Sequence, residues 1–283
     1  MKKIFGILGY PLSHTLSPII HNGLYKEYNL EYIYLVLEKQ KPTKKILLQN
    51  DSISFDGLSV TIPHKEWAFK NTDYSDEASK IMKASNTLFK KEGKIYAYNT
   101  DGMGAVRAIL EYSPFVFNSE KDILILGSGG SARGISYSIL KQGLNKNKIC
   151  ISARNTKTSS SLVKDLNKIQ KDKSYTIPLE ELKENRFGLI IHTTPMGMKG
   201  NENNSLLELD FLQKENIIFD IVYNPLETEL VKLAKLKGCK IIPGYEMLIY
   251  QAMEQFFIFT EIKVTEKQIE KVRNWVLKKL YTD

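Results

Sequence analysis

The sequence predicts an α/β fold with two domains, the second of which contains a doubly wound parallel sheet. Three observations predict it. Short apolar runs typical of buried strands alternate with helical patterns along the 283 residues. A glycine-rich turn, residues 127–134, follows the apolar run 123–126 and leads into a helical pattern. This turn lies well inside the chain, so the residues before it are expected to form an α/β domain of their own.

The first half of the chain reads as five strands and three helices. Strands are expected at residues 3–8, 32–37, 58–62, 86–89 and 95–98, and helical patterns at 18–28, 41–49 and 63–70. The last two strands form a hairpin that turns at Gly93, and a helical pattern follows at 103–110.

The second half shows the alternation typical of a parallel sheet. Strands are expected at residues 123–126, 148–152, 188–193, 217–222 and 240–242, with helices between several of them. Two closing helical patterns, 245–259 and 265–280, have no strand after them. We therefore expect a substrate-binding domain at 1–105 and a nucleotide-binding domain at 106–261, with the closing helix at about 262–283 packing back onto the first domain.

The composition is that of a globular protein. Hydrophobic residues make up 42% and charged residues 25% of the chain, which allows a sizeable core. The formal net charge of +8 suggests a nucleic-acid binder as one alternative, but the lysines are scattered and form no basic stripe interleaved with aromatic residues. We expect no nucleic-acid partner, and no membrane span, because no apolar run approaches ~18 residues.

Cysteine and histidine usage narrows the class further. Cys150 and Cys239 lie in apolar strand-like runs without a CxxC partner, which favours a reducing compartment and no disulfide framework. The apolar N-terminal run shows no cleavage pattern, so we predict a cytoplasmic protein. None of the four histidines has metal-ligand spacing, and no metal is predicted.

The glycine turn predicts a dinucleotide site. Small residues let the backbone approach a pyrophosphate, and N–H groups at the helix start face the anion. A chain that uses NAD usually ends the next strand with Asp or Glu, which holds the ribose hydroxyls. Here that strand is followed by Arg154 and Lys157, and no acidic residue occurs between Gly127 and Asp165. We predict NADP, with both basic residues facing its 2′-phosphate; the alternative is a glycine loop in an ordinary α/β domain.

Lys65 is the candidate reactive group of the first domain. The segment Ser59-Val-Thr-Ile-Pro-His-Lys65 runs from a strand into a helix, with Pro63 expected at the first helical position. Lys65 then lies in the first helical turn, beside the positive end of the helix dipole. That position disfavours a cation and favours proton transfer.

Two other helix starts carry polar side chains. Asp101 precedes the helical pattern 103–110, where it would cap the helix or, if it faces Lys65, help to hold a substrate hydroxyl. Thr15 and Ser17 precede the helix expected at 18–28. Their hydroxyls would bind a carboxylate, or Ser17 would be a plain N-cap.

A series of segments in the same order resembles the shikimate dehydrogenase family, NADP-dependent enzymes of aromatic amino-acid biosynthesis that interconvert 3-dehydroshikimate and shikimate. The resemblance runs nearly end to end. Besides the glycine turn, its segments are Gly9-x-Pro-x-x-His14-Thr-x-Ser-Pro18, Val60-Thr-Ile-Pro-x-Lys65, Asn86-Thr87, Asn99-Thr-Asp101, Thr193-Thr-Pro-Met-Gly-Met198, Asp220-Ile-Val-Tyr-x-Pro225 and Gly244-x-x-Met247-Leu-x-x-Gln251-Ala252.

The resemblance implies a role for each matching residue. Lys65 and Asp101 would be the catalytic pair. The substrate carboxylate would be held by Thr15, Ser17 and Tyr223, and the ring hydroxyls by Thr61, Asn86 and Gln251. The pyrophosphate turn would consist of Gly127, Gly129, Gly130, Ser131 and Ala132. Arg154 would face the 2′-phosphate, and Gly244 with Met247 would lie against the nicotinamide.

The resemblance also implies a Rossmann nucleotide domain, a cleft that closes to exclude water, and a monomer or homodimer. NADPH would deliver hydride to the C3 carbonyl while Lys65 protonates the oxygen. Several positions depart from the family pattern. Thr15 replaces a serine, Ser59 an asparagine, and Ala153-Arg154-Asn155 the usual Asn-Arg-Thr, while His192 stands where an asparagine is usual.

The departures leave alternatives open. Thr15 keeps a hydroxyl but adds a methyl group, which leaves a quinate or dual quinate/shikimate dehydrogenase as the nearest alternative. His192 is interpreted as a satisfied structural side chain at a strand end. An alternative of another class is a regulator that kept the nucleotide fold without its chemistry.

Overall fold

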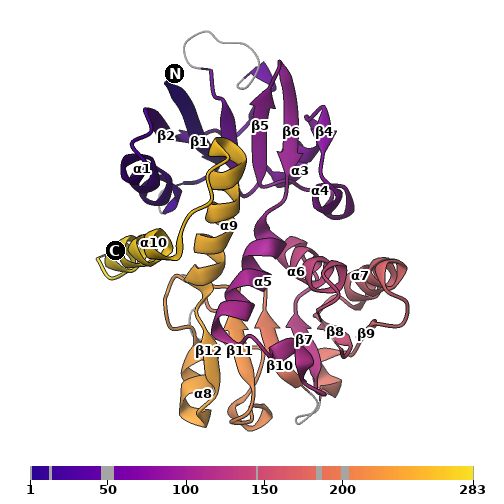
Figure 1. Cartoon of the computed structure of the whole chain (residues 1–283). Helices are drawn as coiled ribbons and strands as arrows, with labels where there is room; N and C mark the ends of the chain where they lie inside the picture. The colour runs from indigo at the N-terminus through magenta and orange to yellow at the C-terminus, as the bar shows by residue number, and fades with distance from the viewer. Residues whose placement is uncertain are drawn as a thin grey trace. The chain divides into compact units, whose positions relative to one another are not determined.

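The computed structural model describes residues 2–12, 15–45, 54–144, 146–182, 187–198 and 204–282 (Figure 1). The chain divides into two compact units, which we call unit 1 (Met1–Asp101 and Ile249–Asp283) and unit 2 (Gly102–Leu248). The sequence predicts divisions near 105 and 261. The second division falls earlier because the later part of helix α9 (Gly244–Thr260) packs in unit 1, where Phe259 stacks on Phe5 with ring centroids 4.6 Å apart.

Unit 1 is built on a six-stranded mixed sheet in the order β2-β1-β3-β5-β6-β4. Its strands are β1 (Lys3–Gly9), β2 (Tyr32–Glu38), β3 (Gly57–Val60), β4 (Tyr74–Ser75), β5 (Thr87–Lys91) and β6 (Lys94–Tyr98). β1 pairs in parallel with β2 and β3, whereas β5 runs antiparallel to both β3 and β6. The β5–β6 hairpin turns at Glu92 and Gly93, whose φ angles of 51° and 73° suit the tight turns that join twisted strands.

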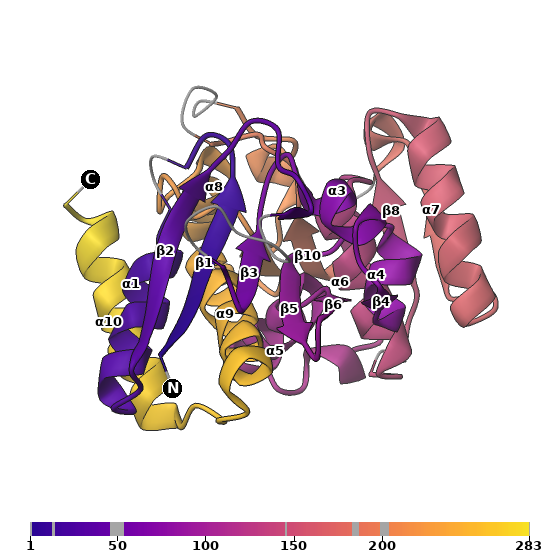
Figure 2. The same ribbon diagram turned by 90° about the horizontal axis from the view of Figure 1, so that it is seen from above.

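The helices of unit 1 include the closing helix of the chain. They are α1 (Ser17–Glu27), α3 (Lys65–Lys70), α4 (Glu77–Met82), the later part of α9, and α10 (Glu266–Leu280). Figures 1 and 2 show α1 and α10 side by side, and a Cβ atom on Gly23 of α1 would collide with the ring of Trp275 in α10. Close approach of these helices therefore requires glycine at this position. The helical pattern at 41–49 and the motif residue His14 fall largely or wholly outside the described residues.

Unit 2 contains a six-stranded parallel sheet. Its strands are β7 (Asp122–Leu126), β8 (Ile149–Ser152), β9 (Ser174–Thr176), β10 (Phe187–His192), β11 (Ile217–Asp220) and β12 (Lys240–Ile242). Its helices are α5 (Asp101–Tyr112, from its second residue on), α6 (Gly130–Lys141), α7 (Thr156–Ile169), α8 (Glu229–Lys237) and the start of α9, with short 3₁₀ helices at Val116–Asn118, Leu179–Glu181 and Leu209–Phe211.

The strand order of unit 2 is β9-β8-β7-β10-β11-β12. Counted from β7, this is the 3-2-1-4-5-6 order of the Rossmann fold, so the predicted doubly wound parallel sheet is confirmed. The four residues of β8 are all buried, as are four of the five in β7, because helices cover both faces of such a sheet. Within the described ranges, no helix is long and apolar enough to span a membrane.

Candidate active site

Lys65 is the first residue of α3, directly after a turn that follows β3. The sequence predicts that this helix starts at Pro63, and this is wrong. The backbone N–H of His64 donates to the Thr61 carbonyl at 2.9 Å, so residues 61–64 form a separate turn and the helix begins two residues later. Lys65 nevertheless lies in the first helical turn.

Lys65 and Asp101 form an ion pair, with Nζ 2.6 Å from Oδ2. The side chain of Asp101 is 10% exposed and that of Lys65 is 30% exposed. A lysine ammonium has three hydrogens, so this bond leaves further donors for a ligand. The Asp101 carboxylate points to Lys65, although the residue also begins α5; the acceptor for its own backbone N–H is Asn99 Oδ1 at 3.2 Å.

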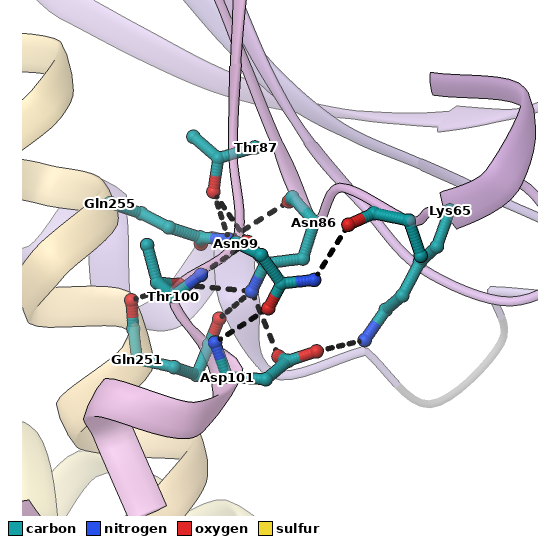
Figure 3. Close-up of polar contacts among 9 residues, drawn as sticks. Lys65, Asn86, Thr87, Asn99, Thr100, Asp101, Gln251 and Gln255 are labelled. Atoms are coloured by element: carbon teal, nitrogen blue, oxygen red, sulfur yellow. Dashed lines mark hydrogen bonds and ion pairs between the residues drawn. The ribbon is translucent and has the colours of Figure 1, made fainter. Parts of the chain in front are cut away.

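Asn86 connects this ion pair to the core of unit 1 (Figure 3). Its Nδ2 lies 2.8 Å from Asp101 Oδ1, 2.9 Å from Thr100 Oγ1 and 3.3 Å from Gln251 Oε1. Its Oδ1 accepts from the backbone N–H of Thr100 at 2.9 Å and from the Thr87 hydroxyl at 2.9 Å. Both oxygens of Asp101 therefore have a fixed donor, and the carboxylate is held in one orientation.

Helix α9 contributes two glutamines, one helical turn apart. Gln251 accepts from Asn86 Nδ2 at 3.3 Å. Gln255 accepts from the Ser59 hydroxyl at 2.7 Å and donates to the Asn86 carbonyl at 3.1 Å. Gln255 was not predicted as a site residue, although its spacing of four from Gln251 places both on one helix face.

Thr15, Ser17 and Thr61 lie in unit 1 without a described hydrogen bond to the Lys65–Asp101 pair. Ser17 is the first residue of α1, after an N-cap at Leu16, so the plain N-cap interpretation is wrong. Its backbone N–H faces Thr15 Oγ1 at 3.4 Å. Thr61 follows β3, and its methyl carbon would be 2.5 Å from a Cβ atom on Gly9.

The glycine turn of unit 2 lines a pocket of about 330 Å³ at the carboxyl ends of β7, β8 and β10. The pocket is lined by Gly127, Ser128, Gly129, Ala153, Arg154, Asn155, Leu179, Thr193, Thr194, Pro195, Met196 and Leu206. The strand order reverses at β7, between β8 and β10. Ligands of open α/β sheets bind at this switch point.

The first three glycines of the turn differ in what surrounds them. Gly127 has φ +112°, and a Cβ atom there would lie 2.5 Å from Thr193 Oγ1, so the backbone itself requires glycine. A Cβ atom on Gly129 or Gly130 would meet no atom within 4 Å. These two positions leave open space at the start of the 12-residue helix α6, where a pyrophosphate is stabilised by backbone N–H groups. The turn therefore fits a dinucleotide.

Arg154 and Lys157 differ in position. Arg154 is exposed and lines the pocket. Lys157 is exposed in the first turn of α7 and is absent from the described lining; its backbone N–H donates to Asn155 Oδ1 at 3.1 Å. Asn155 is the N-cap of α7, a role that was not predicted.

The remaining predicted residues lie in unit 2, outside the described pocket lining. Ser131 and Ala132 belong to the first turn of α6, and Tyr223 follows β11. Gly244 begins α9, and a Cβ atom there would be 2.5 Å from the Val222 carbonyl oxygen. Met247 is 8% exposed. In the described part of the chain, no three His, Cys, Asp or Glu side chains gather as metal ligands would.

Comparison with known proteins shows the family of the chain. The family model of the shikimate dehydrogenase substrate binding domain matches residues 7–88, and that of the shikimate 5′-dehydrogenase C-terminal domain matches 244–272. The shikimate dehydrogenase (NADP(+)) of Leptospira interrogans is 47% identical over 280 residues, covering 98% of this chain and 96% of that protein. The chain belongs to the shikimate dehydrogenase family.

Solved structures of the family have the same fold. A shikimate dehydrogenase in complex with NADP+ is 32% identical with a TM-score of 0.89, and the match covers 99% of this chain and 96% of that one. The shikimate 5-dehydrogenase of Thermus thermophilus, in complex with NADP(H) and shikimate, is 25% identical with a TM-score of 0.84 and covers 96% and 99% of the two chains. In this chain, the Lys65–Asp101 pair is the candidate catalytic pair and the glycine pocket is the candidate cofactor site.

Proposed function

We propose that the chain catalyses the reversible, NADP-dependent reduction of 3-dehydroshikimate to shikimate. The observation that carries the proposal is the Lys65–Asp101 ion pair of 2.6 Å, held by Asn86 in a family whose members carry out this reaction. The enzyme is an oxidoreductase. When bound, NADPH supplies the hydride for the carbonyl carbon.

Lys65 supplies the proton. Its ammonium donates a hydrogen bond to the substrate carbonyl oxygen and transfers the proton as negative charge develops there, which yields the hydroxyl of shikimate. In the reverse direction the neutral amine accepts that proton. Asp101 orients Lys65 and accepts a hydrogen bond from a neighbouring substrate hydroxyl, because a carboxylate has more acceptor sites than its two described donors use.

The other substrate contacts follow the family pattern. Gln251 and Asn86 bind ring hydroxyls together with Thr61, and the hydroxyls of Thr15 and Ser17, with Tyr223, bind the carboxylate. Hydrogen bonding between Asn86 and Gln251 supports their acting together. Thr15 keeps the hydroxyl that the family position requires.

The cofactor residues divide by the part of NADP that they hold. Gly127, Gly129 and Gly130, with Ser131 and Ala132, hold the pyrophosphate. Arg154 binds the 2′-phosphate through its guanidinium, with Lys157 nearby, and Gly244 and Met247 lie against the nicotinamide. The exposed position of Arg154 in the pocket wall supports the NADP preference.

We place the enzyme in the cytoplasm, as a monomer or homodimer. Cys150 and Cys239 are buried and are not joined in a disulfide, which fits a reducing compartment.

Initial rates with shikimate and quinate, each with NADP and NAD, test the proposal. We expect kcat/KM to be highest for shikimate with NADP. A higher value for quinate would assign the chain to the quinate alternative. No turnover with any pair, combined with NADPH binding, would favour a non-catalytic regulator.

A further inference from the structure

His192 lies in a hydrogen-bonded chain beside the cofactor pocket that the proposed chemistry does not use. It is the last residue of β10 and is 3% exposed. Its Nδ1 lies 2.9 Å from Asp220 Oδ1, and its Nε2 lies 2.6 Å from Thr194 Oγ1. Asp220 is buried at the end of the neighbouring strand β11, and Thr194 lines the pocket. The contacts therefore run from a buried carboxylate, through an imidazole, to a hydroxyl in the pocket wall.

The surroundings of Asp220 assign the tautomer of His192. Asp220 Oδ1 also faces the backbone N–H of Val222 at 3.1 Å, and Oδ2 accepts from the Thr228 hydroxyl at 2.5 Å. Donors on both oxygens are typical of an ionised carboxylate, which can only accept. We therefore assign the ring hydrogen to Nδ1. With that hydrogen on Nδ1, the other ring nitrogen of the neutral imidazole, Nε2, is an acceptor.

The Thr194 hydroxyl has one acceptor site that no described contact uses. A threonine hydroxyl has one donor and two acceptor sites. Its hydrogen goes to His192 Nε2, and one acceptor site faces the backbone N–H of Met196 at 3.3 Å. One acceptor site remains among the described contacts. The adjacent Thr193 differs, because its hydroxyl donates to the Leu126 carbonyl at 2.7 Å and has no described bond to His192.

We propose that His192, oriented by Asp220, is a positioning residue that makes Thr194 a hydrogen-bond acceptor in the cofactor pocket. The inference rests on the proposed use of NADP. The group that Thr194 recognises is a donor of the bound dinucleotide, either a ribose hydroxyl or the carboxamide NH₂. A phosphate oxygen does not fit, since it also accepts. The tautomer of His192 thus determines that Thr194 binds a donor group of the dinucleotide and not a phosphate oxygen.

Three variants test the coupling: Thr194→Val, His192→Asn and the double variant. Valine keeps the shape of Thr194 without the hydroxyl. Asparagine keeps a donor near the position of Nδ1, towards Asp220, but does not extend to Thr194. We expect each single substitution to raise the Kd for NADPH about three- to tenfold, as for loss of one hydrogen bond, with a larger change in the KM for NADPH than in kcat. The double variant should bind no more weakly than Thr194→Val alone, because both changes remove the same interaction.

Two matched variants show whether the loss of affinity comes from the Thr194 hydroxyl itself. Thr194→Ser retains the hydroxyl and should restore most of the affinity. Thr193→Val removes the adjacent hydroxyl, and its effect should multiply with that of His192→Asn. Urea unfolding of each variant shows that the fold is intact. The proposal would be overturned if the fold-increases in the Kd for NADPH caused by Thr194→Val and His192→Asn multiplied in the double variant, or if neither substitution changed the Kd. Ring-nitrogen NMR shifts that place the His192 hydrogen on Nε2 would also overturn it.

A cofactor analogue identifies the donor. The 3-acetylpyridine analogue of NADP carries a methyl group in place of the carboxamide NH₂. If Thr194 binds the carboxamide, Thr194→Val will not weaken binding of the analogue; if it binds a ribose hydroxyl, NADP and the analogue will lose affinity equally. Wild-type protein that binds NADPH but shows no coupling would overturn only this inference, whereas wild-type protein that fails to bind NADPH would overturn the proposed function as well.

Discussion

The polar residues of unit 1 are bonded to one another, whereas the glycine turn of unit 2 encloses open space. Asp101 is bonded to Lys65 and Asn86. A Cβ atom on Gly129 or Gly130, in contrast, would meet nothing within 4 Å. The polar site of unit 1 is therefore ordered by its own hydrogen bonds, whereas the glycine turn of unit 2 leaves room for a ligand.

This difference fits the role proposed for each site. Proton transfer depends on a donor held in a fixed position, and the buried network around Asp101 provides that position before any ligand binds. A pyrophosphate is bound largely by backbone N–H groups at a helix start, which requires the absence of side chains. Substitutions in unit 1 should therefore lower kcat, and those in the unit 2 turn should raise the Kd for NADPH.

Lys65→Ala should have the largest effect. Loss of the proton donor is expected to lower kcat by about 10²- to 10⁴-fold, while the Kd for NADPH stays within about twofold of wild type, because the residue belongs to the other site. Stopped-flow hydride transfer and NADPH fluorescence titration measure the two quantities.

Lys70→Ala is the matched control for Lys65. Lys70 lies on the same helix, exposes 68% of its side chain and pairs with Glu66 at 3.6 Å. Its removal should leave kcat unchanged. Turnover of Lys65→Ala close to that of the control would exclude Lys65 from the reaction.

Arg154→Ala should have the next largest effect, and on the cofactor alone. Loss of a charge-assisted bond to the 2′-phosphate is expected to raise the KM for NADPH about 10- to 100-fold. The KM for NADH, which lacks this phosphate, should not change. Steady-state rates with both cofactors test this expectation.

Lys157→Ala tests which of the two basic residues, Arg154 or Lys157, contacts the 2′-phosphate. Since Arg154 lines the described pocket and Lys157 does not, the Lys157 variant should show a smaller rise in the KM for NADPH. Equal rises in both variants, or a rise in the KM for NADH as well, would contradict the assignment of the phosphate contact to Arg154.

The buried histidines His21 and His192 differ in their hydrogen bonding. His192 of unit 2 has a hydrogen-bond partner at each nitrogen. His21 of unit 1 stacks on Tyr34 at 4.3 Å, and neither of its nitrogens has a described partner in hydrogen-bonding geometry. Burial lowers the pKa of His21 from 6.5 to about 3, with a smaller opposing effect of Gln255.

The direction in which pH changes the free energy of unfolding follows from the protons bound by the unfolded and folded chains. Between about pH 6.5 and 3 the unfolded chain protonates His21 and the folded chain does not, so stability is full above pH 6.5 and falls as the pH is lowered. At pH 5 this difference corresponds to about 2 kcal/mol. His21→Phe, which keeps an aromatic ring, should lose less free energy of unfolding between pH 7.5 and 5 than wild type in urea titrations. Equal losses in the two proteins would mean that His21 is protonated in the fold.

The Rossmann unit was predictable because its signals are local. Buried parallel strands appear as continuous apolar runs, and β7, β8 and β10 to β12 lie within a few residues of their predicted positions. The short elements β4, α4 and β9 were missed, since two to six residues show no usable period. The start of α3 was placed too early because Pro63, a favourable first helical residue, is used in a turn instead.

The candidate site was only partly predictable. The types and spacing of Lys65 and Asp101 were informative, but their 2.6 Å contact joins residues 36 positions apart and depends on the fold. Gln255 and Thr194 were not predicted as site residues, although Gln255 lies four residues after Gln251 and Thr194 lies in the segment 193–198. They matter through what they bond, Asn86 and His192 respectively, and a single sequence does not contain those pairings.

The smallest expected effects concern the glycine turn, where Gly127 should matter for stability and Gly130 for NADPH binding. Gly127→Ala places a methyl group against Thr193 at φ +112° and should cost about 1–3 kcal/mol of stability. Gly130→Ala meets open space at the first position of α6, so the free energy of unfolding should stay the same or rise by about 0.5 kcal/mol. Because the methyl group would occupy room near the pyrophosphate, the Kd for NADPH should still rise several-fold in Gly130→Ala. Calorimetric melts and fluorescence titration measure both quantities; a stable variant with unchanged NADPH affinity would mean that the pyrophosphate does not lie at this end of α6.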